Sequence, residues 1–220
     1  MLCIMNYDEL PDDVLVEMAK CGDMNAFEQL FWRYHEKIYT FVWHRLQDHT
    51  ESEDATQETF VRALEALPTL KANNTFGTWL HTIAKNICND ILRKRAREVP
   101  LSVAHDAFVE PLSSNTTNHT VEDYVWASDA DTCDPEGMLA RNELKMRVHE
   151  AIANLPPAQR DVVVLHHIEE MPVAEVAQIL GIPIGTVLSR LARAREALRD
   201  ALAQYVEEGS INCEVNRDEA

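Results

Sequence analysis

The sequence predicts an all-α protein of two small helical domains joined by a long, flexible, acidic linker. Apolar residues recur at helical spacing before residue 98 and again after residue 137. Between them, residues 98–137 carry nine acids and no Lys or Arg, and such a composition buries too little apolar area to fold. Only 6 of the 220 residues are glycine, which favours helices and disfavours a glycine-rich phosphate loop.

The linker sets the expected domain boundaries. We expect a first helical domain over residues 1–97, the linker over 98–137, and a second helical domain over 138–205. The remaining residues, 206–220, carry five acids against one Arg. They are expected to form a disordered acidic tail.

The first domain is expected to contain three or four helices. Asp23 or Asn25 is suited to cap the first, and residues 51–54 give the second an acidic start. Pro68 ends that helix, and residues 73–75 offer caps for the next. The apolar positions that carry the periodicity are Phe27, Leu30, Phe31 and Tyr34, then Phe60, Ala63, Leu64 and Leu67, then Phe76, Trp79, Leu80, Ile83, Ile87 and Ile91.

The second domain ends in a predicted helix-turn-helix. Prolines interrupt its apolar periodicity, and the last helices are expected between Val173 and about Tyr205. Ala177 keeps the first helix thin where the second crosses it. Gly181 can take the positive φ of a tight turn, and Val187 packs back between the two helices.

The second helix of this motif has the pattern of a DNA-recognition helix. One apolar stripe is expected to be buried: Val187, Leu191, Ala194 and Leu198. The outward face then presents Thr186, Ser189, Arg190 and Arg193. Polar and basic residues near a helix N-terminus suit a major groove. An ordinary helical hairpin with a solvated arginine face is the alternative.

The formal net charge of −17 is distributed unevenly along the chain. Residues 76–97 carry five bases and one acid, and the late helix carries four arginines from Arg190 to Arg199. Local basic faces can meet phosphate, but the overall negative field makes isolated DNA binding weak. DNA binding is therefore expected to need a larger partner.

The sequence carries no recognisable catalytic or metal-binding motif. It lacks the H-E-x-x-H, C-x-x-C and G-x-S-x-G patterns, and its nearest approach to a ligand cluster is His166-His167 followed by Glu169-Glu170. Adjacent residues on a helix point about 100° apart, so at most one of each pair would face a common ion. We therefore expect no enzyme activity, no metal and no cofactor.

The same patterns predict a cytoplasmic protein without membrane insertion. No apolar run approaches the roughly 18 residues that a bilayer crossing needs, and no secretory signal is recognisable. The five scattered cysteines are expected to be reduced thiols.

Five stretches resemble bacterial RNA polymerase sigma factors of the sigma-70 family, in particular those of the extracytoplasmic-function (ECF) type. Residues 54–63 (DATQETFVRA) resemble the family's region 2.2, and residues 76–86 (FGTWLHTIAKN) with 90–95 (DILRKR) resemble regions 2.3 and 2.4. Residues 155–160 (LPPAQR) and 185–195 (GTVLSRLARAR) resemble region 4. The resemblance implies a protein that binds core RNA polymerase, reads two promoter elements and helps open the duplex.

The resemblance also implies functional residues. Those expected to bind core polymerase are Asp54, Gln57, Glu58 and Arg62, although periodicity alone favours a solvated face there. Those expected to bind the minus-ten element are Lys71, Asn73, Asn74, His81, Lys85, Asn86, Asn89 and Arg93. Those expected to bind the minus-thirty-five element are Gly185, Thr186, Ser189, Arg190 and Arg193. An anti-sigma factor is the expected regulator.

Two features depart from the family's pattern. Leu188 stands where many relatives carry a lysine or another polar residue, so a phosphate or base contact is expected to be either missing or replaced by an apolar one. The acidic linker is long for the family, and we hypothesise that it imitates nucleic acid, the alternative being a plain tether. The main alternative function is a dimeric helix-turn-helix regulator in which residues 1–97 sense a ligand.

Overall fold

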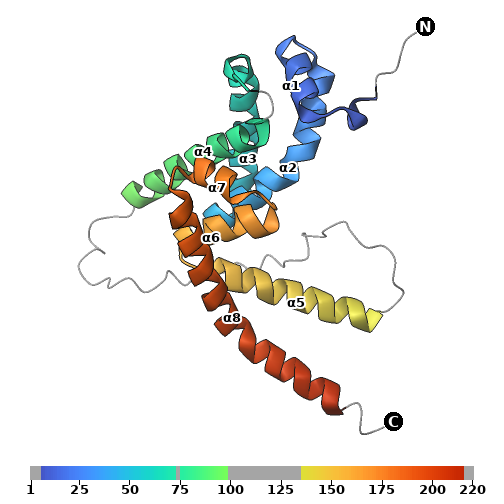
Figure 1. Ribbon diagram of the computed structural model, residues 1–220, viewed down its shortest axis with the longest axis vertical. Coiled ribbons are helices and arrows are strands. Elements are labelled where there is room, and N and C mark those ends of the chain that lie inside the picture. The colour runs from blue at the N-terminus through green and yellow to red at the C-terminus, as the bar shows by residue number, and fades with distance from the viewer. Residues whose placement is uncertain (1–5, 73–74, 99–134, 216–220) are drawn as a thin grey trace. The chain divides into compact units, whose positions relative to one another are not determined.

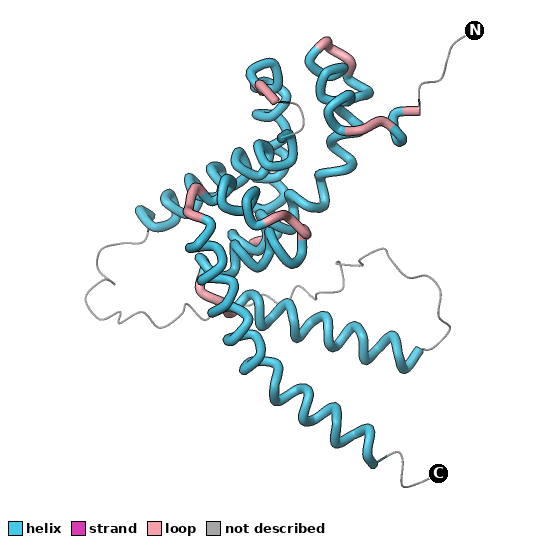
Figure 2. The backbone as a smooth tube through the Cα atoms, viewed as in Figure 1, coloured by secondary structure: helices cyan, strands magenta, loops and turns pink. Residues whose placement is uncertain are grey.

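The regular elements in the part that the structure describes are all helices, joined by short turns and loops (Figures 1 and 2). The computed structural model describes the backbone of residues 6–72, 75–98 and 135–215, and the side chains of residues 6–72, 75–97 and 144–203. No strand occurs in these ranges, so the predicted all-α fold class is confirmed. Most of the linker predicted over residues 98–137 lies outside the described residues.

The amino-terminal part agrees with the expected three or four helices. Along the described chain its elements are η1 (Tyr7–Glu9), α1 (Asp12–Lys20), α2 (Met24–Leu46), α3 (His49–Ala66), η2 (Leu67–Thr69) and α4 (Phe76–Glu98).

The carboxyl-terminal part is also built of helices. Its elements are α5 (Pro135–Ala153), α6 (Pro157–Val163), the π-helical turn η6 (Val164–Ile168), α7 (Val173–Leu180) and α8 (Ile184–Val215). Helix α8 continues past the end expected near Tyr205. Residues 206–215 contain no proline, and polarity alone does not stop a helix.

The chain falls into two compact units. One contains Met1–Ala96 together with Pro156–Arg195, and the other contains Arg97–Leu155 together with Glu196–Ala220. The first unit therefore combines α1 to α4 with the helix-turn-helix, although these segments are far apart in sequence. It also contains every described residue that the sequence analysis assigned to a site.

Side-chain caps define where the amino-terminal helices begin. The Asp23 carboxylate accepts hydrogen bonds from the amides of Asn25 and Ala26 at 3.0 and 3.3 Å, which confirms Asp23 as the cap of α2. Helix α3 begins before the predicted acidic start, because Asp48 caps it by accepting from the Glu51 amide at 2.8 Å. The proposed caps Asn73 and Asn74 of α4 lie outside the described residues.

Apolar side chains of α2, α3 and α4 form the core of the amino-terminal helices. Ile38, Phe41, Ala63 and Leu80 all have an exposed fraction of 0%. Burying each of the large side chains contributes about 1.5–3 kcal/mol to folding. Leu64 is 37% exposed, so its predicted burial is wrong. Leu64 lies at the edge of the apolar side of α3 rather than at its centre.

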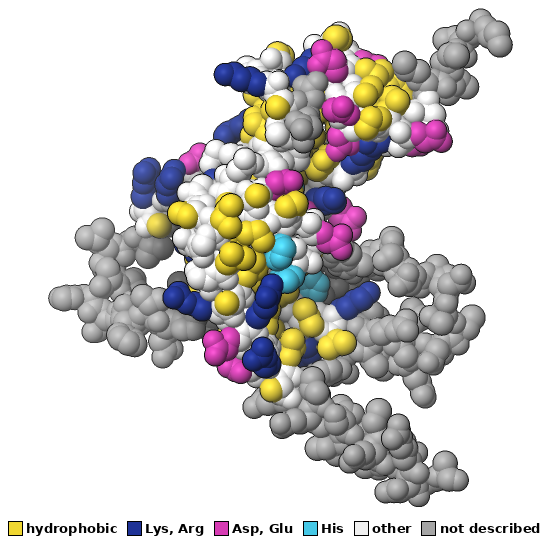
Figure 3. All heavy atoms as spheres, in the orientation of Figure 1, with side chains coloured by type: hydrophobic (Ala, Val, Ile, Leu, Met, Phe, Trp, Pro, Cys, Tyr) yellow, Lys and Arg dark blue, Asp and Glu magenta, His cyan; other side chains and the backbone are white. Residues whose placement is uncertain are grey.

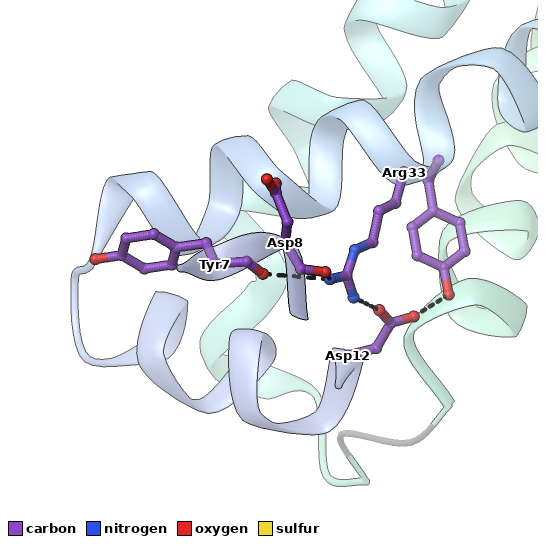
Figure 4. A network of polar contacts seen from close by, with 5 residues as sticks. Tyr7, Asp8, Asp12 and Arg33 are labelled. Atoms are coloured by element: carbon purple, nitrogen blue, oxygen red, sulfur yellow. Dashed lines mark hydrogen bonds and ion pairs between the residues drawn. The ribbon is translucent and has the colours of Figure 1, made fainter. Parts of the chain in front are cut away.

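A polar network fixes the start of the chain against α2 (Figure 4). Arg33 donates to the Asp12 carboxylate at 2.6 Å and to the carbonyl oxygens of Tyr7 and Asp8 at 3.3 and 2.7 Å. The Tyr34 hydroxyl donates to the second Asp12 oxygen at 2.5 Å. Burial and this hydrogen bond raise the pKa of Tyr34, so its hydroxyl remains a donor at neutral pH.

Helices α7 and α8 form the predicted helix-turn-helix. Gly181 ends α7 with a φ of +69°, and its amide donates to the Ala177 carbonyl at 2.9 Å. The bend between Val173–Leu180 and Ile184–Ala203 is 104°, as is typical of the motif. Val187 is 0% exposed, so the predicted roles of the glycine and the valine are confirmed.

No single helix among the described residues is long and apolar enough to cross a membrane. Helix α7 and the first part of α8 reach the required length and hydropathy only when they are taken together.

Candidate nucleic-acid interface

The outer face of α3 carries the four residues that the resemblance assigns to polymerase docking. Asp54, Gln57, Glu58 and Arg62 are all exposed. The Arg62 Nε donates to Glu58 Oε1 at 2.7 Å, one helical turn away. An exposed pair of this kind contributes only about 0.3–0.5 kcal/mol, so both charged groups can be redirected toward a protein partner at little cost.

Three exposed apolar side chains, which sequence reasoning missed, lie on α2 and α3. Trp32, Val61 and Leu64 are 65%, 53% and 37% exposed. Phe31 links α2 to α3, because its ring centroid lies 4.7 Å from that of Phe60 and 5.1 Å from that of Trp32. The signal in the sequence is the adjacent aromatic pair at 31 and 32, since two neighbours on a helix cannot both face one core.

His81 does not lie on the surface of α4. Its side chain is 0% exposed, its Nδ1 is hydrogen-bonded to the Gly77 carbonyl at 2.8 Å, and its ring packs against Phe41 at a centroid distance of 5.6 Å. Its Nε2 lies 3.6 Å from a carboxylate oxygen of Glu169. The prediction that His81 faces outward is therefore wrong, because a segment distant in sequence covers this part of α4.

Two other residues of the predicted minus-ten set, Lys85 and Asn89 of α4, are only partly exposed. The Lys85 ammonium donates to the carbonyl of Ile179 in α7 at 2.5 Å, and Asn89 accepts from Arg45 of α2 at 2.8 Å. Burial lowers the pKa of Lys85, and the nearby Arg45 lowers it further. Both side chains already have protein partners where DNA was expected.

The other residues predicted for the minus-ten element are placed differently. Lys71, Asn86 and Arg93 are exposed, whereas Asn73 and Asn74 lie outside the described residues. In Figure 3, Lys and Arg side chains gather over the carboxyl end of α4, which is the part of the helix that contains Arg93.

The start of α8 presents the residues predicted for the minus-thirty-five element. Gly185, Ser189 and Arg193 are exposed, while Thr186 and Arg190 are partly exposed. The Ser189 hydroxyl donates to the Thr186 carbonyl at 3.0 Å. The opposite side of the helix is buried, so this polar and basic face lies on the outside of the helix-turn-helix.

Two apolar residues share the exposed part of α8. Ile184 and Leu188 are 51% and 53% exposed, and their spacing of four residues places them on one side of the helix. Leu188 is marked in the sequence by its departure from the family's pattern, whereas the exposure of Ile184 beside it is visible only in the structure.

The two histidines and two glutamates around η6 do not converge. The His166 Nδ1 is bonded to a main-chain carbonyl at 2.8 Å, and the His167 Nε2 lies 3.5 Å from the Arg195 Nε. Glu169 is buried against α4, whereas Glu170 is exposed. Within the described residues, no group of three or more His, Cys, Asp or Glu side chains is arranged to hold a metal ion.

Sequence reasoning also missed charged residues that join α2 to α6. Arg45 donates to the Asp161 carboxylate at 2.9 Å, with only 11% and 17% of the two side chains exposed. Arg160 donates to the carbonyl of His44 at 2.9 Å. Burial raises the pKa of Asp161, although Arg45 opposes the shift. The sequence holds no signal that would pair these residues, because they are 116 positions apart.

Two family models match the chain, one in its amino-terminal part and one in its carboxyl-terminal part. The model described as "Sigma-70 region 2" matches residues 30–98, which include α3 and α4. The model described as "Sigma-70, region 4" matches residues 145–198, which include the helix-turn-helix.

Relatives of known name are similar over nearly the whole length. The ECF RNA polymerase sigma factor SigW of Bacillus subtilis is 34% identical over 85% of this chain and 94% of its own. The RNA polymerase sigma-H factor of Pseudomonas aeruginosa is 32% identical over 90% and 96%. The ECF RNA polymerase sigma-E factor of Escherichia coli is 31% identical over 87% and 94%.

Solved structures share the fold. CnrH, in complex with the cytosolic domain of CnrY, matches with a TM-score of 0.59 and 26% identity over 88% of this chain and 97% of its own. RpoE of Bartonella quintana, in complex with the anti-sigma factor NepR, matches in fold with a TM-score of 0.58 and 22% identity over 80% and 96%. Since both sigma-70 regions match in order and relatives above 30% identity cover most of both chains, this chain belongs to the ECF group of the sigma-70 family.

Proposed function

We propose that this chain binds core RNA polymerase, recognises the minus-ten and minus-thirty-five promoter elements, and promotes transcription initiation. The observation that carries the proposal is the presence of two sigma-70 regions in order, over residues 30–98 and 145–198. The polymerase performs the chemistry, so this chain acts as a recognition subunit and not as an enzyme. Because the polymerase and the promoters lie in the cytoplasm, the chain works there too.

The polymerase-binding part of the proposal rests on α3. Its exposed polar face, formed by Asp54, Gln57, Glu58 and Arg62, offers charges of both signs to a protein partner. Protein interfaces commonly combine such a rim with aromatic residues at their centre. Trp32 is 65% exposed and suits that central role.

The minus-ten part rests on α4 and the loop before it. Lys71, Asn86 and Arg93 are exposed and can meet a nucleic-acid strand directly. His81, Lys85 and Asn89 can do so only after the segment that covers them has moved. Single strands are bound by positive grooves and by side chains that stack on or read extruded bases.

The minus-thirty-five part rests on the exposed start of α8. Gly185 and Ser189 allow a close approach to the major groove, while Arg190 and Arg193 supply donors for base edges or phosphates. Thr186 adds a hydroxyl at the helix N-terminus. In this assignment the first helical domain, residues 1–97, serves the minus-ten element, and the second, residues 138–205, serves the minus-thirty-five element.

Control by an anti-sigma factor forms a further part of the proposal. The resemblance implies such a partner, and CnrH, which is 26% identical to this chain, was solved with the cytosolic domain of another protein, CnrY. A net charge of −17 also weakens DNA binding by the free chain. The chain is therefore expected to depend on core polymerase for its activity and on an anti-sigma factor for its inhibition.

Arginine substitutions on α8 test the proposal. After assembly with core polymerase, Arg190→Ala or Arg193→Ala is expected to weaken promoter binding by about 1–3 kcal/mol where the lost contact is to a base edge. Arg199→Ala removes an exposed arginine further along the same helix and serves as the matched control. Gel-shift titration of the holoenzyme, followed by transcription from mapped promoters, measures the effect.

The contrary result is a chain that binds no core polymerase but binds a palindromic duplex tightly as a dimer. That behaviour belongs to the alternative, a helix-turn-helix regulator with a ligand-sensing domain. The match of residues 30–98 to sigma-70 region 2 favours the sigma factor instead.

A further inference from the structure

Helix α1 lies outside the parts of the chain that match the two sigma-70 models. The region 2 model begins at residue 30, whereas α1 covers Asp12–Lys20. One side of the helix, formed by Leu15, Val16 and Ala19, is buried, and the helix packs against α2 and η2. Because η2 directly precedes the loop that is assigned to the minus-ten strand, α1 is a structural neighbour of that loop.

Lys20, the last residue of α1, contacts the chain where the loop begins. Its Nζ donates to the Leu70 carbonyl at 2.6 Å across 50 positions of sequence. The Leu70 side chain is 8% exposed, and the Leu70 amide donates to the Leu67 carbonyl at 3.1 Å. Hydrogen bonds from an ammonium are stronger than those between neutral groups. The backbone immediately before the exposed Lys71 is therefore fixed by a charged group from another helix.

A second residue of α1 supports the chain where the loop ends. Asp12 accepts from the Tyr34 hydroxyl of α2 at 2.5 Å and from Arg33 at 2.6 Å (Figure 4). The Tyr34 ring packs against Phe76, the first residue of α4, at a centroid distance of 5.3 Å. A Cβ at Gly77 would lie 2.9 Å from Cε1 of this ring, so the glycine permits the close packing. Asp12 thereby fixes the ring against which α4 begins.

Residues 71–75 connect these two supported ends. Lys71, Ala72 and Thr75 are exposed, and Thr75 donates to the Ala72 carbonyl through its amide at 3.2 Å and its hydroxyl at 2.7 Å. A site reads an extruded base accurately only if its groups are held within about 0.5 Å of the required positions. Contacts at both ends of a short loop restrict the positions that its groups can take.

We propose that Lys20 is a positioning residue for base recognition in the minus-ten element, and that α1 is the support of the loop at residues 71–75. Lys20 acts through the Leu70 carbonyl, so it affects the accuracy of recognition more than the overall affinity for DNA. The inference rests on the proposed function, because it takes this loop to read a base of the minus-ten element.

The test compares the wild-type chain with Lys20→Met, each assembled with core polymerase. Methionine keeps an unbranched side chain and removes the ammonium that donates to Leu70. Lys20→Arg is the conservative variant, because it keeps a charged donor. Lys145→Met is the matched control, since it removes the same charge at an exposed position of α5.

Each holoenzyme is titrated against promoters in which single bases of the minus-ten element are replaced. Selectivity is the ratio of the affinity for the unaltered promoter to the affinity for an altered one. A wrong base ordinarily weakens binding by about 5- to 150-fold. We expect Lys20→Met to lower this ratio at one base position by at least about twofold, the smallest effect usual for a residue that acts through a contact.

The other proteins separate positioning from folding and from charge. Lys20→Arg is expected to restore the selectivity, and Lys145→Met is expected to match the wild type. Because selectivity is a ratio measured on one preparation, partial unfolding of a variant leaves it unchanged. A role of Lys20 in stability alone would lower the urea midpoint without changing the selectivity.

Tyr34→Phe tests the other end of the loop. It removes the hydroxyl that donates to Asp12 and keeps the ring. We expect its selectivity to fall at the same base position as in Lys20→Met. A fall at a different position would overturn the role of α1 as a common support for the loop.

Failure of this inference can be separated from failure of the proposed function. If the wild-type holoenzyme discriminates among minus-ten bases but Lys20→Met keeps every ratio, the positioning role is overturned and the proposed function stands. Equal weakening on all promoters also overturns it, because that is the behaviour of a phosphate contact. If the wild-type holoenzyme shows no preference for the minus-ten element, the proposed function itself fails.

Discussion

We propose that one side chain, that of Leu188, influences promoter preference. It is 53% exposed near the start of α8, between the exposed residues Gly185 and Ser189. An isolated exposed leucine needs no explanation. Here, however, Ile184 lies one turn earlier on the same side, and the helix is assigned to the major groove. The apolar group that a major groove offers is the C5-methyl of thymine.

We therefore expect Leu188 to contact a thymine methyl in the minus-thirty-five element. Replacing the responsible thymine by deoxyuridine removes only the methyl group, and holoenzyme binding is expected to weaken by about 0.8 kcal/mol, the value of one buried methylene. In Leu188→Ala the same replacement is expected to have no effect. Gel-shift titration with thymines replaced one at a time measures both. Equal losses in the wild type and the variant would contradict the contact.

At the scale of an element, the turn of the helix-turn-helix depends on one backbone angle. Gly181 has a φ of +69°, and a Cβ added there would meet no atom within 4 Å. Substitution by alanine therefore adds backbone strain without a clash. Gly185 also has open space for a Cβ, but it lies inside α8 without a positive φ. Comparing substitutions at the two glycines therefore separates the effect of backbone conformation on stability from the effect of packing.

We expect Gly181→Ala to lower the free energy of unfolding by about 1–2 kcal/mol, the cost of a left-handed conformation for an L-residue. Gly185→Ala is expected to raise it by about 0.5–1 kcal/mol, because alanine loses less entropy in a helix than glycine does. Urea denaturation followed by circular dichroism measures both changes. Effects of the same sign would show that backbone conformation does not decide stability at this turn.

The elements show what periodicity can and cannot predict. The cap Asp23, the turn glycine Gly181 and the buried Val187 each follow from local stereochemistry, and each was predicted correctly. Periodicity also identified the polar face of α4. It did not reveal that a later segment of the chain covers part of that face, and for this reason His81 was wrongly placed on the surface.

At the scale of the whole molecule, long-range charged contacts are the part that sequence reasoning missed. Arg45 and Asp161 are paired across 116 positions of sequence, and neither belongs to a motif that brings them together. One sequence without its fold gives no way to choose among many possible partners. The family resemblance supplied the function, but the contacts of Thr78, His81 and Lys85 of α4 with η6, α7 and the turn between them are visible only in the structure.

The buried carboxyl group of Glu169, which lies beside His81 of α4, makes stability depend on pH. Burial raises the pKa of Glu169 above its ordinary value of 4.5; His81 and Lys37 oppose this shift, and Glu36 adds to it. A carboxyl whose pKa is raised by folding holds its proton more tightly in the folded chain than in the unfolded chain. Its contribution to stability is therefore fully present below pH 4.5 and is lost as the pH rises through the raised value.

Glu169→Gln removes this contribution, because the amide does not titrate. The free energy of unfolding of the variant, relative to the wild type, is therefore expected to increase as the pH rises from about 4.5 toward neutrality. Burial raises the pKa of Asp161 in the same direction, but Asp161 is present in both proteins and cancels to first order in the difference. Glu170→Gln changes an exposed neighbour and is expected to give a nearly flat difference. Urea denaturation across this pH range measures both differences. A flat difference for Glu169→Gln as well would contradict the prediction. It would mean that the buried carboxyl ionises as freely in the folded chain as in the unfolded one.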